Sequence, residues 1–220
     1  MKVINLSESP SLLTHYLKEL RSTTIQKDSM RFRRNIERIG EIMAMEISRT
    51  LNYKEENVKT PLGIAPVQVL HDPIVVGTIL RAGLPLHQGF LNMFDNAENA
   101  FLSAYRRAVV GRNGQETLEI VSEYLAAPKL DGKTLLLVDP MLATGMSMEV
   151  AYKALLSHGT PKTVHLACVI GTRQAIEYLQ KTMPENATLW CAAIDPELNE
   201  KKYIVPGLGD AGDLCFGNKL

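Results

Sequence analysis

The sequence has no excess of charge of either sign and no long apolar run. Lys plus Arg and Asp plus Glu each number 24, which argues against a surface built mainly to follow nucleic acid or anionic lipid. The N-terminus has no uninterrupted apolar stretch long enough for a signal peptide or a membrane span. We therefore expect a cytoplasmic protein that binds a small polar ligand, with neither membranes nor nucleic acids among its partners.

Cysteines are few, and the motifs of several common catalytic sites are missing. Cys168, Cys191 and Cys215 are odd in number and lack metal-site spacing, so we expect reduced structural thiols. There is no Gly-x-x-x-x-Gly-Lys-Ser/Thr loop, no Gly-x-Ser-x-Gly elbow and no pair of histidines at ligand spacing. The sequence therefore gives no support to a P-loop nucleotide site, a serine hydrolase or a histidine-bound metal.

The pattern of apolar residues divides the chain into three segments of one domain, residues 1–220. A length of 220 residues with 45% hydrophobic content suffices for one well-buried domain. Residues of about 10–52 show helical spacing and predict two helices, the second capped by Asp28. A polar connection follows around residues 53–66, and a core of about 70–195 precedes a C-terminal segment of about 195–220.

Within the core, short apolar runs alternate with helical segments. This alternation predicts an α/β fold with a mostly parallel sheet flanked by helices. The predicted strands are Ile74–Leu80, Ala100–Tyr105, Leu118–Tyr124, Thr134–Val138, Val164–Ile170 and Leu189–Ile194. The predicted helices are Pro85–Phe94, Ser147–Ser157 and Thr172–Lys181.

The residues that follow the predicted strand Thr134–Val138 form a candidate phosphate site. Ligands of open parallel sheets lie beyond the carboxyl ends of the strands. Here Asp139 ends the strand, and Ala143–Ser147 turns into a helix whose first amides and hydroxyls suit an anion. An ordinary turn with Ser147 as the helix N-cap would explain the small residues equally well. It would not explain Asp139, which can accept hydrogen bonds from ribose hydroxyls.

Two further segments carry weaker signals. Arg81, followed by Ala-Gly, lets a tight loop approach a diphosphate and neutralise its charge. Tyr203–Asp213 contains Gly-x-Gly-x-x-Gly, but the eight residues after Gly212 leave no room for the helix and strand of a dinucleotide fold. We interpret this segment as a loop whose amides and carbonyls bind a planar ligand.

Taken together and in this order, Ile79–Leu84, Asp139–Ser147 and Tyr203–Asp213 resemble the uracil phosphoribosyltransferase family. Asp139-Pro140 fits that family, whereas other phosphoribosyltransferases of this fold usually have two acidic residues there. The resemblance implies a type I phosphoribosyltransferase fold with N-terminal helices and a C-terminal base-binding hood. It also implies that uracil and phosphoribosyl pyrophosphate (PRPP) are converted to UMP and pyrophosphate, as in pyrimidine salvage.

The resemblance also assigns roles to individual residues. It implies catalytic roles for Arg81, Arg106 and Asp210. The implied PRPP-binding residues are Arg81, Arg106, Asp139, Pro140, Met141, Leu142, Ala143, Thr144, Gly145, Met146, Ser147 and Asp210. The implied uracil-binding residues are Tyr203, Ile204, Gly209, Asp210 and Ala211. The cofactor would be Mg²⁺, held through PRPP and water rather than directly by side chains.

Several points stay open at the level of sequence. Arg112 rivals Arg106 as the arginine of a lid that would run from Arg107 to Thr117, and Met146 stands where the family usually has glycine. The alternatives are a nucleotide-sensing RNA-binding regulator, an enzyme of the same type that uses a different base, and a catalytically weak paralogue on the same fold. The resemblance further implies a homodimer or larger homo-oligomer, and it raises activation by GTP as a question.

Overall fold

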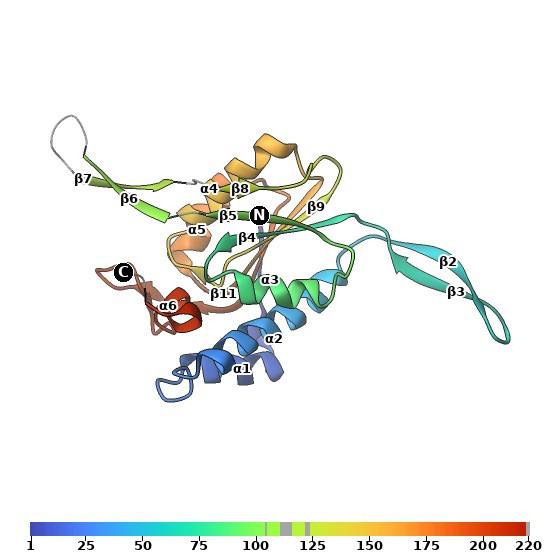
Figure 1. Cartoon of the computed structure of the whole chain (residues 1–220), viewed down its shortest axis with the longest axis horizontal. Helices are drawn as coiled ribbons and strands as arrows, with labels where there is room; N and C mark the ends of the chain where they lie inside the picture. The colour runs from blue at the N-terminus through green and yellow to red at the C-terminus, as the bar shows by residue number, and fades with distance from the viewer. Residues whose placement is uncertain (104, 111–115, 122–123, 219–220) are drawn as a thin grey trace.

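The computed structural model describes residues 1–103, 105–110, 116–121 and 124–218, and its centre is an 8-stranded sheet (Figure 1). The order is β1-β12-β11-β9-β4-β5-β8, with β10 paired to β11. Every pairing is parallel except that of β5 with β8. The strands are β1 (Lys2–Asn5), β4 (Ile74–Leu80), β5 (Glu98–Ser103), β8 (Leu125–Ala126), β9 (Thr134–Val138), β10 (Met141–Leu142), β11 (Thr163–Thr172) and β12 (Thr188–Asp195). The predicted mostly parallel sheet is confirmed.

Helices cover both faces of this sheet. Successive side chains of β9 alternate between two hydrophobic clusters, Leu136 and Val138 entering one and Leu135 and Leu137 the other. The first cluster receives residues of the helices α1 (Leu12–Arg21), α2 (Ser29–Ser48) and α3 (Leu84–Leu91). The second receives residues of α4 (Met146–Leu155) and α5 (Arg173–Thr182). Burial on both faces explains why β4 and β9 are continuous apolar runs in the sequence.

The two predicted N-terminal helices are present. Ser11 caps α1 and Asp28 caps α2 through side-chain acceptors, so the predicted role of Asp28 is confirmed. Helices α2 and α3 pack closely at two glycines, because a Cβ on Gly89 would lie 2.9 Å from the Gly40 Cα. None of the helices in the described ranges is long and apolar enough to cross a membrane.

Two hairpins correct the predicted organisation. The predicted connection of residues 53–66 is instead most of a β-hairpin, β2 (Tyr53–Thr60) with β3 (Gly63–Leu70), which projects from the body as a long arm (Figure 1). The predicted sheet strand Leu118–Tyr124 was wrong: β7 (Glu116–Val121) pairs antiparallel with β6 (Tyr105–Val110) in a separate two-stranded sheet. Strand β1 was not predicted.

The C-terminal segment forms a small hood beside the sheet. It contains the two-stranded sheet of β13 (Glu197–Leu198) and β14 (Ile204–Val205), followed by α6 (Ala211–Phe216). The short 3-10 turns η1 (Leu6–Glu8) and η2 (Leu156–His158) complete the described elements. The sequence predicted a loop here, so α6 is an addition to that prediction.

Candidate active site

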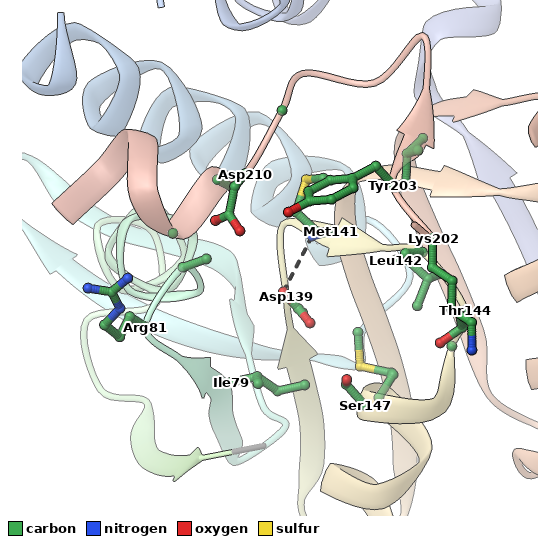
Figure 2. A pocket seen from close by; sticks show the side chains of 18 of the residues that line it. Ile79, Arg81, Asp139, Met141, Leu142, Thr144, Ser147, Lys202, Tyr203 and Asp210 are labelled. Atoms are coloured by element: carbon green, nitrogen blue, oxygen red, sulfur yellow. Dashed lines mark hydrogen bonds between the residues drawn. The ribbon is translucent and has the colours of Figure 1, made fainter. Parts of the chain in front are cut away.

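A cavity of about 690 Å³ lies between the carboxyl ends of β4 and β9 and the C-terminal hood. Figure 2 shows Asp139 between Arg81 and Asp210 on one side and Thr144 and Lys202 on the other. The cavity is lined by residues of three segments of the chain: Ile79, Leu80, Arg81, Ala82, Asp139, Met141, Leu142, Ala143, Thr144, Gly145, Ser147, Met148, Lys201, Lys202, Tyr203, Ile204, Gly209, Asp210, Ala211 and Gly212. The three segments singled out in the sequence therefore meet in one place.

The loop between β9 and α4 presents the start of a helix to the cavity. Gly145 is the N-cap of α4 and has a left-handed backbone with φ of 81°, a conformation that favours glycine. Ser147 lies inside the first turn of α4, so the alternative of Ser147 as N-cap is wrong. The Ser147 side chain and the first amides of α4 are left at the cavity, where a helix N-terminus favours an anion.

Strand β11 holds this loop in place. The amides of Val169 and Ile170 donate to the Pro140 carbonyl at 3.1 and 3.0 Å. The buried Thr172 hydroxyl donates to the Ala143 carbonyl at 2.7 Å and accepts from the Ala175 amide at 3.0 Å. The loop is thus fixed before any ligand arrives, which reduces the ordering cost of binding.

The Asp139 carboxyl lies at the floor of the cavity (Figure 2). Burial raises the pKa of Asp139 to about 7, and the hydrogen bond that it accepts from the Met141 amide at 3.3 Å lowers the pKa only in part. No cationic side chain in the described residues forms an ion pair with it. Asp139 therefore has acceptor capacity available for a ligand.

Arg81 lies at the opposite side of the cavity from Thr144. Its Nη2 is 3.2 Å from Asp213 Oδ1 and 3.4 Å from the Gly217 carbonyl oxygen. These contacts tie the loop after β4 to α6. Because Arg81 and Asp213 are both partly exposed, their ion pair contributes little to stability, and a diphosphate can compete for the guanidinium.

The hood supplies backbone groups and one carboxylate. The buried Ile204 lines the cavity together with Gly209, Asp210 and Ala211. Asp210 is the N-cap of α6 and accepts from the Asp213 amide at 3.0 Å. One end of a planar ligand could thus contact backbone amides and carbonyls, as the sequence predicted for this segment.

An ion pair between a partly exposed arginine and a buried carboxylate fixes the hood to the rest of the chain. Arg21, at the end of α1, donates from Nη1 and Nη2 to the two carboxylate oxygens of Asp195 at 2.8 and 2.7 Å. Arg21 also donates to the Gly207 carbonyl at 2.9 Å, and the Gly207 amide donates to Asp195 at 2.9 Å. We call this set of contacts the Arg21–Asp195 clamp. Sequence reasoning missed Arg21, because nothing local distinguishes it from other helical arginines.

Most predicted site residues line the cavity, and the exceptions are few. Pro140 is buried and does not line it. Met146 lines a neighbouring cavity of about 540 Å³ instead. Arg106 belongs to β6, and Arg112 lies outside the described residues, as does Gly114 of the predicted lid. Lys201 and Lys202 line the cavity but were not predicted, although their position directly before Tyr203 was a usable signal.

Comparison with known proteins agrees with this geometry. The family model described as "Uracil phosphoribosyltransferase" matches residues 7–218. The chain belongs to the uracil phosphoribosyltransferase family. A protein of that name from Porphyromonas gingivalis is 54% identical over 220 residues, 100% of both chains. Another, from Methanothermobacter thermautotrophicus, is 37% identical over 86% of this chain and 85% of its own. The solved structure of the AQ2163 protein from Aquifex aeolicus is 28% identical, with a TM-score of 0.83 and 99% of each chain covered.

The clamp makes a testable prediction about stability in this family member. Arg21→Ala leaves the buried Asp195 carboxylate without its cation, so we expect the free energy of unfolding to fall by about 3 kcal/mol. The matched control is Arg31→Ala, whose partner Glu19 lies 3.1 Å away in a pair with a half-exposed arginine; it should cost less than about 1 kcal/mol. Urea unfolding measures both, and equal losses would contradict the importance assigned to the clamp.

The raised pKa of Asp139 predicts that the free energy of unfolding depends on pH. Its pKa is about 7 in the folded protein, against an ordinary value of 3.8 for an aspartate. Between these two values the folded state binds more protons than the unfolded state, so stability falls as pH rises. Asp139→Asn removes the buried charge. The variant should be more stable than the wild type at about pH 8, and the difference should shrink as pH falls toward about 4.

Urea unfolding across this pH range measures the Asp139 effect. The control is Asp95→Asn, which replaces an exposed carboxylate and should show no such trend. A stability difference for Asp139→Asn that stays constant with pH would argue against a raised pKa.

Proposed function

We propose that the chain transfers the ribose 5-phosphate unit of PRPP to uracil, giving UMP and pyrophosphate. The observation that carries the proposal is the cavity of about 690 Å³ in which the Asp139–Ser147 loop faces the glycine-rich hood. A helix N-terminus suits a phosphate, a carboxyl suits ribose hydroxyls and backbone groups suit a pyrimidine edge. The order of these groups across the cavity matches the order of groups in the product UMP.

Each part of the donor has a matching part of the cavity. In this proposal the 5-phosphate binds at the residues from Ala143 to Ser147, and Asp139 accepts from the ribose hydroxyls. Arg81 binds the diphosphate from the far side. Uracil binds against Tyr203 and Ile204 and hydrogen-bonds to the segment Gly209–Ala211. The Arg81 guanidinium lies next to the hood, 3.2 Å from Asp213 of α6, where it can reach the leaving diphosphate.

Mg²⁺ fits the donor set of this cavity as a cofactor that arrives with PRPP. Oxygen ligands suit this ion, and the diphosphate and water supply most of them. The Asp139 carboxyl faces the same space and has spare acceptor capacity. When bound, the ion would offset the charge that develops on the leaving diphosphate.

The proposed reaction is a displacement at the anomeric carbon. Uracil N1 forms the new bond to carbon, the bond from carbon to the diphosphate oxygen breaks, and the uracil N1 proton passes to solvent. Arg81 and, in this proposal, Arg106 of β6 neutralise the charge of the leaving group. Asp210 orients donor and base at the start of α6. Exclusion of water by the segment 107–117 would protect the donor from hydrolysis.

The assay that tests this proposal measures pyrophosphate release from PRPP and Mg²⁺ with a panel of free bases, with and without GTP. We expect release with uracil. Asp210→Asn should lower turnover roughly 10- to 100-fold, because it removes a charge that contacts the reactants. Asparagine is an equally good N-cap, so α6 and the fold should be retained.

Each arm of the assay has an outcome that would count against the proposal. No pyrophosphate with uracil, or faster release with another base, would contradict the proposed reaction. Unchanged kinetics in Asp210→Asn would remove that residue from the site. A response to GTP decides the separate question of activation, without bearing on the reaction itself.

The projecting hairpin supports a second part of the proposal, a homo-oligomer. Apolar side chains on the β2–β3 arm face solvent, Leu62 at 100% and Ile64 at 74% exposure. Large exposed apolar groups gathered in one place are typical of protein interfaces. We propose that a second copy of the chain covers the arm. A cytoplasmic location, where the free cysteines would stay reduced, completes the proposal.

Sedimentation analysis tests the oligomer. The wild-type mass should exceed the 24.4 kDa of one chain, and the double change Leu62→Glu and Ile64→Glu should shift it toward one chain because charges are costly in an apolar interface. Leu12→Glu, at an exposed leucine on α1, is the control and should keep the assembly. A wild-type protein that sediments as a single chain would contradict the proposal.

A further inference from the structure

Lys202 has an unusual backbone for its residue type. Its φ is 61°, and no other non-glycine residue in the described ranges has a positive φ. This left-handed conformation costs free energy in any residue with a Cβ. The turn is fixed from both sides, because the Lys202 amide donates to the Asn199 carbonyl at 2.8 Å and the Asn199 side chain accepts from the Tyr203 amide at 2.9 Å. Glycine would satisfy this turn at lower cost.

The Lys202 side chain lies at the loop of residues 139–147, which we call the phosphate loop. It lines the main cavity and the neighbouring cavity, and Thr144 lines both as well. In Figure 2 the Lys202 side chain extends from the hood with its ammonium toward Thr144. The strained turn therefore places a cation from the hood close to the start of α4.

The phosphate loop has a need for such a cation. Residues 139–147 include no Lys or Arg, yet a phosphate monoester carries a charge of about −1.5 to −2 at neutral pH. Arg81, at the other side of the cavity, is paired with Asp213. Among the described residues, no carboxylate forms an ion pair with Lys202. Its charge is thus available to a ligand.

We propose that Lys202 binds the 5-phosphate of PRPP beside Thr144, so that the hood contributes to the phosphate site as well as to the base site. This inference rests on the proposed function. It gives a reason for a lysine in a left-handed turn, since strain in a backbone is retained where the side chain serves a ligand. It also joins the two halves of the cavity through one anion.

Three variants separate the effect of the Lys202 charge from the effect of its left-handed backbone conformation. Lys202→Gly removes the cation and suits the turn, so its melting temperature should not fall. Lys202→Arg keeps the charge. Lys181→Ala is the matched control, because Lys181 is an exposed lysine that lines only the neighbouring cavity. Calorimetric binding of ribose 5-phosphate and of pyrophosphate, together with KM for PRPP, measures the effect.

We expect Lys202→Gly to bind ribose 5-phosphate about tenfold more weakly and to raise KM for PRPP by a similar factor, as for a lost charge-assisted hydrogen bond. Pyrophosphate binding should not change, since the diphosphate lies at the Arg81 side. In Lys202→Arg the affinity for ribose 5-phosphate and KM for PRPP should stay within about threefold of the wild-type values. In Lys181→Ala both should equal the wild-type values.

The two levels of the proposal fail in different ways. If Lys202→Gly binds ribose 5-phosphate as tightly as the wild type, the role of Lys202 is overturned while the reaction stands. If Lys202→Gly weakens pyrophosphate as much as ribose 5-phosphate, the assignment to the 5-phosphate is overturned. If the wild type binds neither PRPP nor ribose 5-phosphate, both the proposed function and this inference fall together.

Discussion

The cavity depends on the bidentate ion pair between Arg21 and Asp195. The pair joins the end of α1, the end of β12 and the Gly207 backbone, which are far apart in the sequence. Because a buried carboxylate without a cation is destabilising, separating the hood from the end of β12 would cost free energy. Gln26, which donates to the Leu208 carbonyl at 3.1 Å, and Arg33, which donates to the Cys215 carbonyl at 2.5 Å, extend the same attachment. The N-terminal helices thus act as a support for the base side of the site.

The other half of the cavity follows from the sheet. Adjacent parallel strands end at the same edge, so β4 and β9 bring Arg81 and Asp139 to one space without any contact between the two side chains. The charges are arranged with cations at the sides and a carboxyl at the floor. Burial raises the pKa of Asp139, and a bound cation or hydroxyl donor would favour its ionised form. Ligand binding and the protonation of Asp139 are therefore coupled.

The sequence predicted the buried strands well and the exposed ones poorly, for a physical reason. Strands β4 and β9 have the predicted bounds because burial on both faces requires continuous apolar runs. The residues of β2 are mostly exposed, so no burial pattern marks them, and only pairing with β3 makes them a strand. The predicted place of Leu118–Tyr124 in the main sheet was wrong, because β7 pairs with β6 in a separate sheet. The conformation of Lys202 could not be predicted, since a lysine in the sequence gives no sign of a left-handed backbone.

The steric demand of the phosphate loop falls on Gly145 rather than on Met146. A Cβ at Gly145 would meet the Ala175 carbonyl oxygen at 3.1 Å, and φ of 81° is strained for other residues. Met146 comes one residue later, where the helix has begun, and its side chain is partly exposed toward the neighbouring cavity. Side chains of a helix point outward from its axis, whereas the amides of its first turn point along it. A methionine at this place therefore leaves the anion-facing amides uncovered, and the observation that motivated a catalytically weak paralogue loses its force.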